Sequence, residues 1–131
     1  MSKKKILMID DEEDLCTMIK MHLEVVGDFE VFTALNGQDG LRLARRVKPD
    51  LIVLDILMPG IDGFEVLEDL KKGPATVSIP VIMLSGKSDD LSKAKAAQLY
   101  DELYITKPID GHGLKIKIEE VLNRRAGKTS A

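Results

Sequence analysis

Short, uninterrupted apolar runs of the length of a β-strand restrict the fold of this chain more than any other feature. Four are present: residues 6–9 (ILMI), 51–54 (LIVL), 81–84 (VIML) and the weaker 103–105 (LYI). Continuous apolarity predicts strands that are buried on both faces, as in a parallel sheet. A fifth segment, residues 30–34 (EVFTA), is β-branched and aromatic but more polar, which is typical of a strand nearer the edge of a sheet.

Between these runs, apolar residues recur at the spacing of amphipathic helices. The first pattern stops at Gly27, the second before Pro49 and the third at Gly73 and Pro74, all common helix-ending residues. Strand and helix thus alternate five times, which predicts an α/β fold: a parallel sheet with right-handed crossovers and helices on both faces. The pattern residues are Leu15, Ile19, Leu23 and Val26; Leu41, Ala44 and Val47; Phe64, Leu67 and Leu70; Leu91, Ala94 and Ala97; and Leu114, Ile118, Val121 and Leu122.

Length and composition fit one such domain. The 131 residues suffice for a buried core, and we assign residues 1–123 to the domain and residues 124–131 to a short C-terminal tail. Cys16 is the only cysteine, which excludes an internal disulfide, and the net charge of −3 favours no nucleic-acid role for this chain alone. No apolar run approaches the roughly 20 residues of a membrane helix, and the N-terminus lacks a signal-peptide pattern. A cytoplasmic protein without membrane contact is predicted.

Polar residues follow the apolar runs where each strand ends. In an open parallel sheet all strands point the same way, so these residues meet at one edge, and ligands bind there where the strand order reverses. Of the doubly wound orders found in known proteins, 2-1-3-4-5 suits five strands and gathers the acids that follow the first and third strands. The residues concerned are Asp10 and Asp11, then Asp55, then Ser85 and Gly86, and finally Lys107.

The chemistry of this group points to phosphoryl transfer. Three carboxylates brought together repel one another, and a hard divalent cation relieves the repulsion. Mg²⁺ suits oxygen ligands and is usually held by one or two carboxylates together with a phosphate group. Asp55 can then attack phosphorus and form an aspartyl phosphate, while Lys107 and Ser85 supply the cation and the hydroxyl that phosphoryl transfer needs. Gly86 lets a phosphoryl group approach the backbone because it has no side chain.

Four motifs, ILMIDDEED, PDLIVLDILMPGIDGFEVL, PVIMLSG and YITKP, make residues 4–123 resemble a receiver domain of the bacterial two-component response regulators. The resemblance implies a flavodoxin-like (βα)5 fold. The site residues that it implies are Asp55 as the phosphoacceptor; Asp10, Asp11, Asp55 and the backbone carbonyl of Leu57 as ligands of Mg²⁺ or Mn²⁺; Ser85, Gly86 and Lys107 around the phosphoryl group; and Tyr104 as the aromatic switch residue.

The same resemblance implies the partners. The phosphoryl donor is a phosphohistidine on a sensor histidine kinase or a histidine phosphotransfer domain. The response is read on the surface of the fourth helix, fifth strand and fifth helix, by an output partner that the sequence does not identify. A regulatory phosphoacceptor of this kind is not an enzyme, and it is a monomer or a weak dimer linked to phosphorylation.

Simpler structural roles are open for each site residue. Asp10 and Asp11 are good N-cap residues for the first helix, and Asp55 can be a turn residue before Met58-Pro59-Gly60. Ser85 can be a small polar residue after a strand, and Lys107 a surface lysine. Capping requires only one acid, however, and explains none of the others. Asp62, after the turn at Gly60, is itself predicted to be the N-cap of the third helix.

Three other functions compete with the receiver. A flavodoxin-type cofactor binder would hold a flavin phosphate in its first loop, where Asp10-Asp11-Glu12 would repel it. A phosphatase of the haloacid dehalogenase type places an acid two residues after its nucleophile, where this chain has Leu57. A pseudo-receiver would serve as an interaction module without phosphorylation.

The chain departs from the family pattern at three places. Tyr100-Asp101 replaces the usual small pair before the fifth strand, which affects the output surface. Gly111 and Gly113 each weaken a helix by about 1 kcal/mol relative to alanine, so we expect the fifth helix to start late or to fray. Leu57 and Lys87 offer no group to orient an attacking water, which predicts slow to moderate self-dephosphorylation. In the family the peptide bond before the proline of the TKP motif, here between Lys107 and Pro108, is commonly cis.

Overall fold

A single parallel sheet forms the centre of the molecule in the computed structural model, which describes residues 3–86 and 103–130. The strand order is β2-β1-β3-β4-β5, and all neighbouring strands are parallel. The fold is therefore flavodoxin-like, and the predicted order and the predicted edge position of residues 30–34 are confirmed. The strands are β1 (Lys4–Ile9), β2 (Phe29–Ala34), β3 (Leu51–Asp55), β4 (Val81–Ser85) and β5 (Leu103–Thr106).

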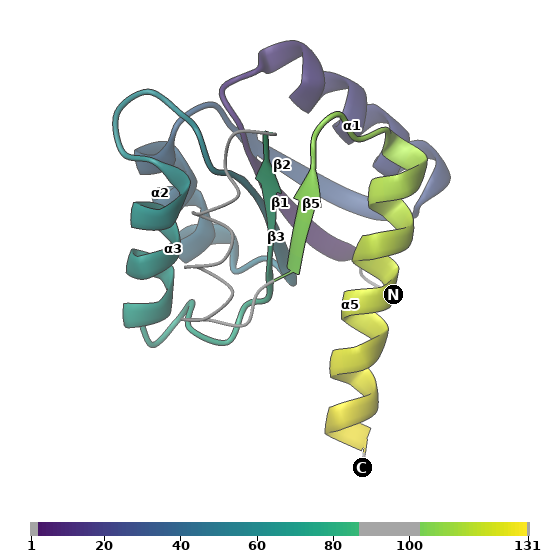
Figure 1. Ribbon diagram of the computed structural model, residues 1–131. Helices are drawn as coiled ribbons and strands as arrows, with labels where there is room; N and C mark the ends of the chain where they lie inside the picture. The colour runs from purple at the N-terminus through teal and green to yellow at the C-terminus, as the bar shows by residue number, and fades with distance from the viewer. Residues whose placement is uncertain (1–2, 87–102, 131) are drawn as a thin grey trace.

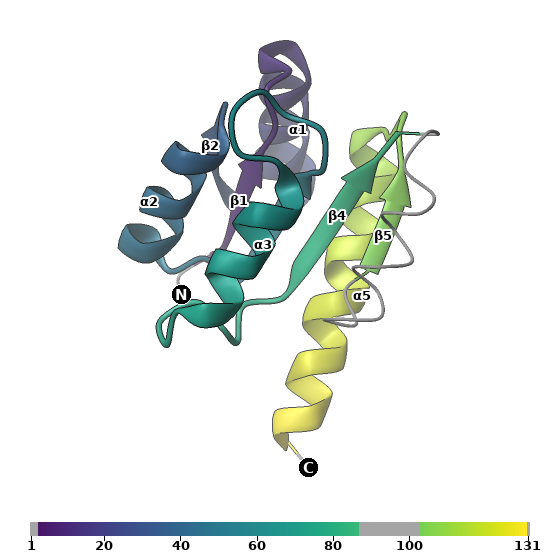
Figure 2. The same cartoon turned by 60° about the vertical axis from the view of Figure 1, so that its left-hand side comes forward.

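Helices cover both faces of this sheet, as the alternation of elements predicts. Helices α1 and α5 lie on one face, and α2 and α3 lie side by side on the other (Figures 1 and 2). Their bounds are α1 (Glu13–Val26), α2 (Gly37–Val47), α3 (Gly63–Lys72) and α5 (Gly111–Ser130). The helix predicted around Leu91, Ala94 and Ala97 falls outside the described residues, as do Lys87, Tyr100 and Asp101.

The central strand β3 shows why the apolar runs are continuous. Its alternate residues belong to different halves of the core: Ile52 and Leu54 pack with α2 and α3, whereas Leu51 and Val53 pack with α1 and α5. A strand covered on both sides must be apolar at every position, because successive side chains point to opposite faces. In α1 the buried stripe consists of Cys16, Ile19 and Leu23, while Val26 is exposed.

Local side-chain bonds define the starts of the helices. Asp62 caps α3 by accepting a hydrogen bond from the Glu65 N–H, and Glu65 bonds back to the Asp62 N–H, which confirms the predicted cap. The expected late start of the fifth helix is wrong, because α5 begins at Gly111. Asp110 Oδ1 accepts a hydrogen bond from the Gly113 N–H at 2.7 Å, and Leu114 packs in the core. A cap and buried contacts thus outweigh the low helix propensity of glycine.

Helix α5 continues to Ser130, so residues 124–130 are helical. Figure 1 shows this helix extending past the end of the sheet toward the C-terminus. The division between domain and tail at residue 123 stays a prediction.

Candidate functional site

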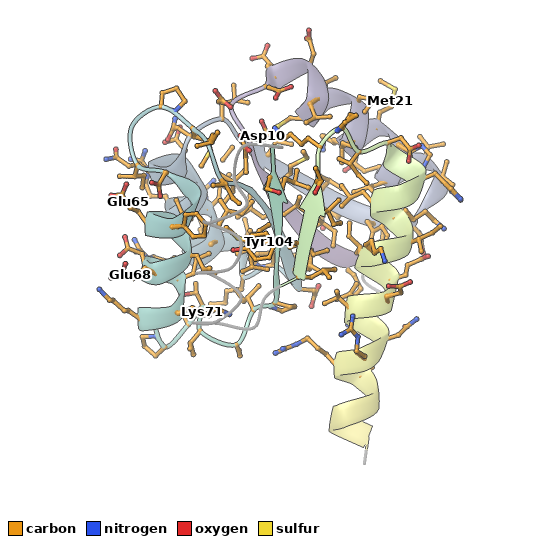
Figure 3. All side chains as sticks on the ribbon, in the orientation of Figure 1. Asp10, Met21, Glu65, Glu68, Lys71 and Tyr104 are labelled. Carbon is orange, nitrogen blue, oxygen red and sulfur yellow. The ribbon has the colours of Figure 1, made fainter. Side chains whose placement is uncertain are left out.

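Two acids meet at the carboxyl end of the sheet because their strands are neighbours. Asp10 directly follows β1, Asp55 ends β3, and the register pairs Ile9 with Leu54. The two residues are only 0% and 4% exposed. The exposed Asp11 completes a group in which one oxygen from each carboxylate lies within 4.8 Å of the other two. Figure 3 shows Asp10 at this end of the sheet. The predicted convergence of the three acids is confirmed.

Asp10 uses its two oxygens differently. Its Oδ1 accepts a hydrogen bond from the Glu12 N–H at 2.9 Å, while its Oδ2 lies 2.9 Å from Lys107 Nζ. The N-cap of α1 is Glu12, whose side chain makes no capping hydrogen bond. Neither Asp10 nor Asp11 therefore holds the N-cap position of α1. Helix capping, the alternative role of these two acids, does not explain why they lie together with Asp55.

Lys107 is the cation of the site. Its Nζ lies 2.9 Å from Asp10, 3.0 Å from Glu12 Oε1 and 3.4 Å from Asp55 Oδ1, and its side chain is 19% exposed. The Lys107 N–H donates to the Ser85 carbonyl at 2.7 Å, and the peptide bond to Pro108 is cis. The alternative of a surface lysine is thus wrong. Glu12 is an additional partner for which no role was predicted, although it stands in the acidic triplet after the first strand.

The surroundings of the site raise the pKa of both central groups, Asp55 and Lys107. Burial, followed by the charge of Asp10, raises the pKa of the Asp55 carboxyl to about 7, although Lys107 opposes the shift. For Lys107, burial alone lowers the pKa of the ammonium, but hydrogen bonds to Asp10 and Glu12 and the charges of Asp10 and Asp55 outweigh burial and raise it. Without a further cation, the cluster holds more negative charge than one lysine neutralises.

Ser85 brings a hydroxyl to the same edge. It ends β4 next to β3, is fully buried, and its Oγ has no hydrogen-bond partner among the described residues. A buried hydroxyl without a partner is costly, so this one is available to a ligand. Gly86 follows it and is partly exposed.

The structure places the other two predicted residues, Leu57 and Tyr104, in different surroundings. The Leu57 side chain is 59% exposed, two residues after Asp55, so it takes no part in the core. Tyr104 lies in β5 and packs against the core half that faces α2 and α3 (Figure 3). The metal-ligand role of the Leu57 carbonyl and the switch role of Tyr104 stay predictions.

Gly63 packs against the backbone of the strand end that carries Asp55. No feature of the sequence predicted this contact. The Gly63 N–H donates to the Ile56 carbonyl at 2.8 Å. A Cβ at this position would lie 2.4 Å from the Asp55 carbonyl oxygen and 2.7 Å from Ile56 Cα. Both are backbone atoms and cannot rotate away, so the start of α3 packs directly on the strand end that carries Asp55.

Gly63→Ala is therefore expected to destabilise the protein by about 1–3 kcal/mol, the usual range for overpacking, measured by urea unfolding. The matched control is Gly113→Ala, where a Cβ would meet Asp110 Oδ1 at 3.1 Å and Ile109 Cδ1 at 3.3 Å. Both neighbours are side-chain atoms that can move by a few tenths of an ångström, and alanine is the better helix former, so the control should change stability by less than about 1 kcal/mol. Equal stability of the two variants would contradict this role of Gly63.

The donor set suits a hard divalent cation. Asp10, Asp11 and Asp55 offer only oxygen ligands, and Mg²⁺ is commonly bound by a small number of carboxylates. One of the three carboxylates is exposed, which leaves the group open to solvent on one side. In the described parts of the chain, these acids form the one group of at least three potential ligands found at metal-binding spacing.

Comparison with known proteins agrees with this geometry. Residues 6–119 match the family described as response regulator receiver domain. The chain is 36% identical over 121 residues to the alkaline phosphatase synthesis transcriptional regulatory protein PhoP of Bacillus subtilis, covering 92% of this chain and 49% of that protein. It is 38% identical over 121 residues to the phosphate regulon transcriptional regulatory protein PhoB of Pseudomonas aeruginosa, covering 92% and 52%. The chain thus spans about half the length of these curated relatives.

Solved structures give the same result. A CheY-like response regulator receiver domain protein from Methanospirillum hungatei superposes with a TM-score of 0.88 at 28% identity, covering 97% of this chain and 99% of that one. A receiver domain protein from Clostridium thermocellum gives 0.85 at 34% identity, covering 94% and 97%. No helix in the described residues is long and apolar enough to span a membrane. With an acid cluster, a lysine and a buried hydroxyl at the carboxyl ends of its strands, this chain belongs to the response regulator receiver domain family of two-component signalling.

Proposed function

We propose that Asp55 accepts a phosphoryl group from a phosphohistidine of a sensor histidine kinase or a histidine phosphotransfer domain. One observation carries this proposal: Asp55 lies within 4.8 Å, oxygen to oxygen, of Asp10 and Asp11 and at 3.4 Å from Lys107 Nζ. The proposed nucleophile, the proposed metal-binding acid pair and a cation therefore lie together at one edge of the sheet. These are the parts that phosphoryl transfer by positioning and charge neutralisation requires.

In the proposed reaction, a carboxylate oxygen of Asp55 attacks the phosphorus atom of the donor. A P–O bond forms on Asp55 while the P–N bond breaks, and its electron pair returns to the donor imidazole nitrogen. Only the ionised carboxylate is a good nucleophile. Since burial raises the pKa of Asp55 to about 7, nearby positive charge is needed to keep this carboxyl ionised at neutral pH.

Asp10, Asp11, Asp55 and the Leu57 backbone carbonyl are the proposed ligands of Mg²⁺ or Mn²⁺. When bound, the metal neutralises charge on the carboxylates and on the phosphoryl oxygens. The buried Ser85 Oγ, which has no partner among the described residues, is the proposed donor to a phosphoryl oxygen. Lys107 would turn its ammonium from Asp10 to that group, and Gly86, which has no side chain, would let the group approach the backbone.

The consequence of phosphorylation is proposed to be a shift between two states of the output surface. Ser85 ends β4, Lys107 directly follows β5, and Tyr104 lies within β5. A phosphoryl group that binds Ser85 and Lys107 would therefore act on the strand that carries Tyr104. The surface of the fourth helix, β5 and α5 would then bind an output partner or support a weak dimer. The fourth helix lies outside the described residues.

We further propose a regulatory role rather than an enzymatic one, in the cytoplasm, where a kinase has access to ATP. The relatives in Bacillus subtilis and Pseudomonas aeruginosa are named transcriptional regulatory proteins, which supports an output in gene control by a longer protein of this kind. A pseudo-receiver is the remaining alternative, and the presence of Asp55, Lys107 and Ser85 in one site argues against it.

The direct test is incubation of the purified protein with acetyl phosphate. With Mg²⁺, intact-mass spectrometry should show the addition of one phosphoryl group, and peptide mapping should place it on the peptide that contains Asp55. Chelation of the metal by EDTA should remove the labelling. No gain in mass would favour the pseudo-receiver, and multiple turnover of a phosphomonoester would instead favour a phosphatase.

A further inference from the structure

Strand β2 forms a free edge of the sheet, because it stands at one end of the strand order. It has six residues, whereas the strand at the opposite end, β5, has four. Its sequence, FEVFTA, is rich in the β-branched and aromatic residues that favour strands. An exposed edge of this kind offers N–H and C=O groups to a strand of another chain.

Two side chains of α1 occupy the middle of this edge. Lys20 Nζ donates to the Val31 carbonyl at 2.7 Å, and the Val31 N–H donates to Glu24 Oε2 at 3.1 Å. Lys20 and Glu24 also pair with each other, with Lys20 Nζ at 3.0 Å from the same Oε2. The pair stands four residues apart on the helix, the spacing that lets two side chains meet.

The direction of the Val31 groups shows what this contact does. Within a strand, the N–H and the C=O of one residue point to the same side. Both groups of Val31 meet α1 side chains and therefore point away from β1. The Lys20–Glu24 pair thus presents one donor and one acceptor, as a neighbouring strand would.

The ionisation of Glu24 reflects the same contact. The hydrogen bond from the Val31 N–H, followed by the one from Lys20, holds the pKa of this carboxyl below its ordinary value. Both the Val31 N–H of β2 and the Lys20 ammonium therefore favour the charged form of Glu24.

We propose that the outer edge of β2 can dock a strand of another chain and that the Lys20–Glu24 pair blocks this docking. When the pair is removed and the edge is open, the docked strand is β2 of a second copy of this chain. This edge is separate from the proposed phosphorylation site and does not depend on it.

Self-pairing is favoured by the sequence of β2. In an antiparallel pair centred on Val31, the two Val31 residues exchange both backbone hydrogen bonds. Phe29 then faces Thr33 of the other copy, and Glu30 faces Phe32, so no like charges stand opposite each other. The arrangement is symmetric, which suits a closed dimer.

The test opens the edge with Lys20→Ala/Glu24→Ala, in which alanine preserves the helix. Sedimentation velocity over a range of concentrations should show a shift from monomer toward dimer. The matched control is Glu68→Ala/Lys72→Ala, because that pair has the same spacing and the same 3.0 Å contact but lies on α3, which covers the opposite face of the sheet from α1 (Figure 1). The control should sediment like the unmodified protein. Glu24→Gln, which still accepts the Val31 N–H, should also stay as monomeric as the unmodified protein.

Amide hydrogen exchange locates the effect. In the unmodified protein the Val31 amide should exchange about tenfold more slowly than the Thr33 amide, which points to the same edge and has no such α1 partner among the described residues. In the opened variant the Thr33 amide should become protected as the dimer forms.

Dimerisation of the opened variant alone, with protection of Thr33, supports the proposal. A variant that stays monomeric, a dimer without protection of Thr33, or dimerisation of the α3 control as well would overturn it. Should the opened variant not fold, equal exchange of Val31 and Thr33 in the unmodified protein would overturn it independently.

Discussion

Asp55→Asn is expected to abolish phosphorylation by acetyl phosphate in the presence of Mg²⁺. Asparagine has nearly the shape of aspartate, but its amide oxygen is a poor nucleophile and carries no charge for a metal. Because Asp55 is the one buried acid besides Asp10 in the described residues, no third buried carboxylate is present there to take its place beside Asp10 and Lys107. Loss of labelling in intact-mass spectra is the measurement.

The control for this variant is Asp62→Asn. Asp62 caps α3 a few residues away, and asparagine is an equally good N-cap, so the fold should be retained. Labelling of this control at the level of the unmodified protein would show that the loss is specific to Asp55. Labelling of Asp55→Asn at the unmodified level would contradict the assignment of the phosphoacceptor.

Lys107→Met is expected to lower the free energy of unfolding of the metal-free protein by about 3 kcal/mol. Removal of one partner of a buried ion pair leaves the other charge without compensation in a poorly solvated place. Here the stranded group is Asp10, which is 0% exposed and lies 2.9 Å from the lysine. Urea unfolding with EDTA present gives the free energy directly.

The control for the lysine variant is Lys72→Met. Lys72 pairs with Glu68 at 3.0 Å, but the side chains are 69% and 55% exposed, so the pair is screened by solvent. Its removal should change stability by less than about 1 kcal/mol. Equal effects of the two substitutions would contradict a special role of Lys107 in stability.

The loss caused by Lys107→Met should also depend on pH. Burial raises the pKa of Asp55 to about 7 in the folded protein, whereas the pKa of an aspartate in the unfolded chain is about 4. The folded protein therefore binds the Asp55 proton more tightly than the unfolded chain does. The resulting contribution to stability is complete below about pH 4 and is lost as the pH rises through about 7. Lys107 opposes that shift, and its removal raises the pKa of Asp55 further. The difference between the two proteins should therefore be larger at about pH 8 than at about pH 5. A difference that grows toward pH 5 would contradict this account.

Much of the fold follows from local sequence features. The run at residues 51–54 predicts a strand buried on both faces, and the structure buries it between two core halves. Asp62 before an apolar pattern predicts a helix start, and it caps α3. The late helix start predicted from Gly111 and Gly113 is wrong, because the Asp110 cap and the packing of Leu114 outweigh the low helix propensity of glycine there.

The acid cluster could also be predicted, since one rule about parallel strands brings Asp10, Asp11 and Asp55 to the same edge. The partners of each side chain could not. Nothing near Lys107 in the sequence indicates that its Nζ contacts Glu12, which lies 95 residues away. The same holds for the approach of Gly63 to the Asp55 carbonyl, which depends on how α3 packs on β3.

The order of the elements, the burial of the central strands and the edge where the site residues gather could thus be predicted from the amino-acid sequence alone. These features depend on the spacing of apolar residues, on the common direction of the parallel strands and on hydrogen bonds between residues a few positions apart. Other features became visible only in the folded molecule. Asp10 pairs with Lys107, the Ser85 hydroxyl is buried without a partner among the described residues, and Lys20 and Glu24 bond to Val31. Those contacts depend on the relative placement of packed elements to within an ångström or so, which no local pattern encodes.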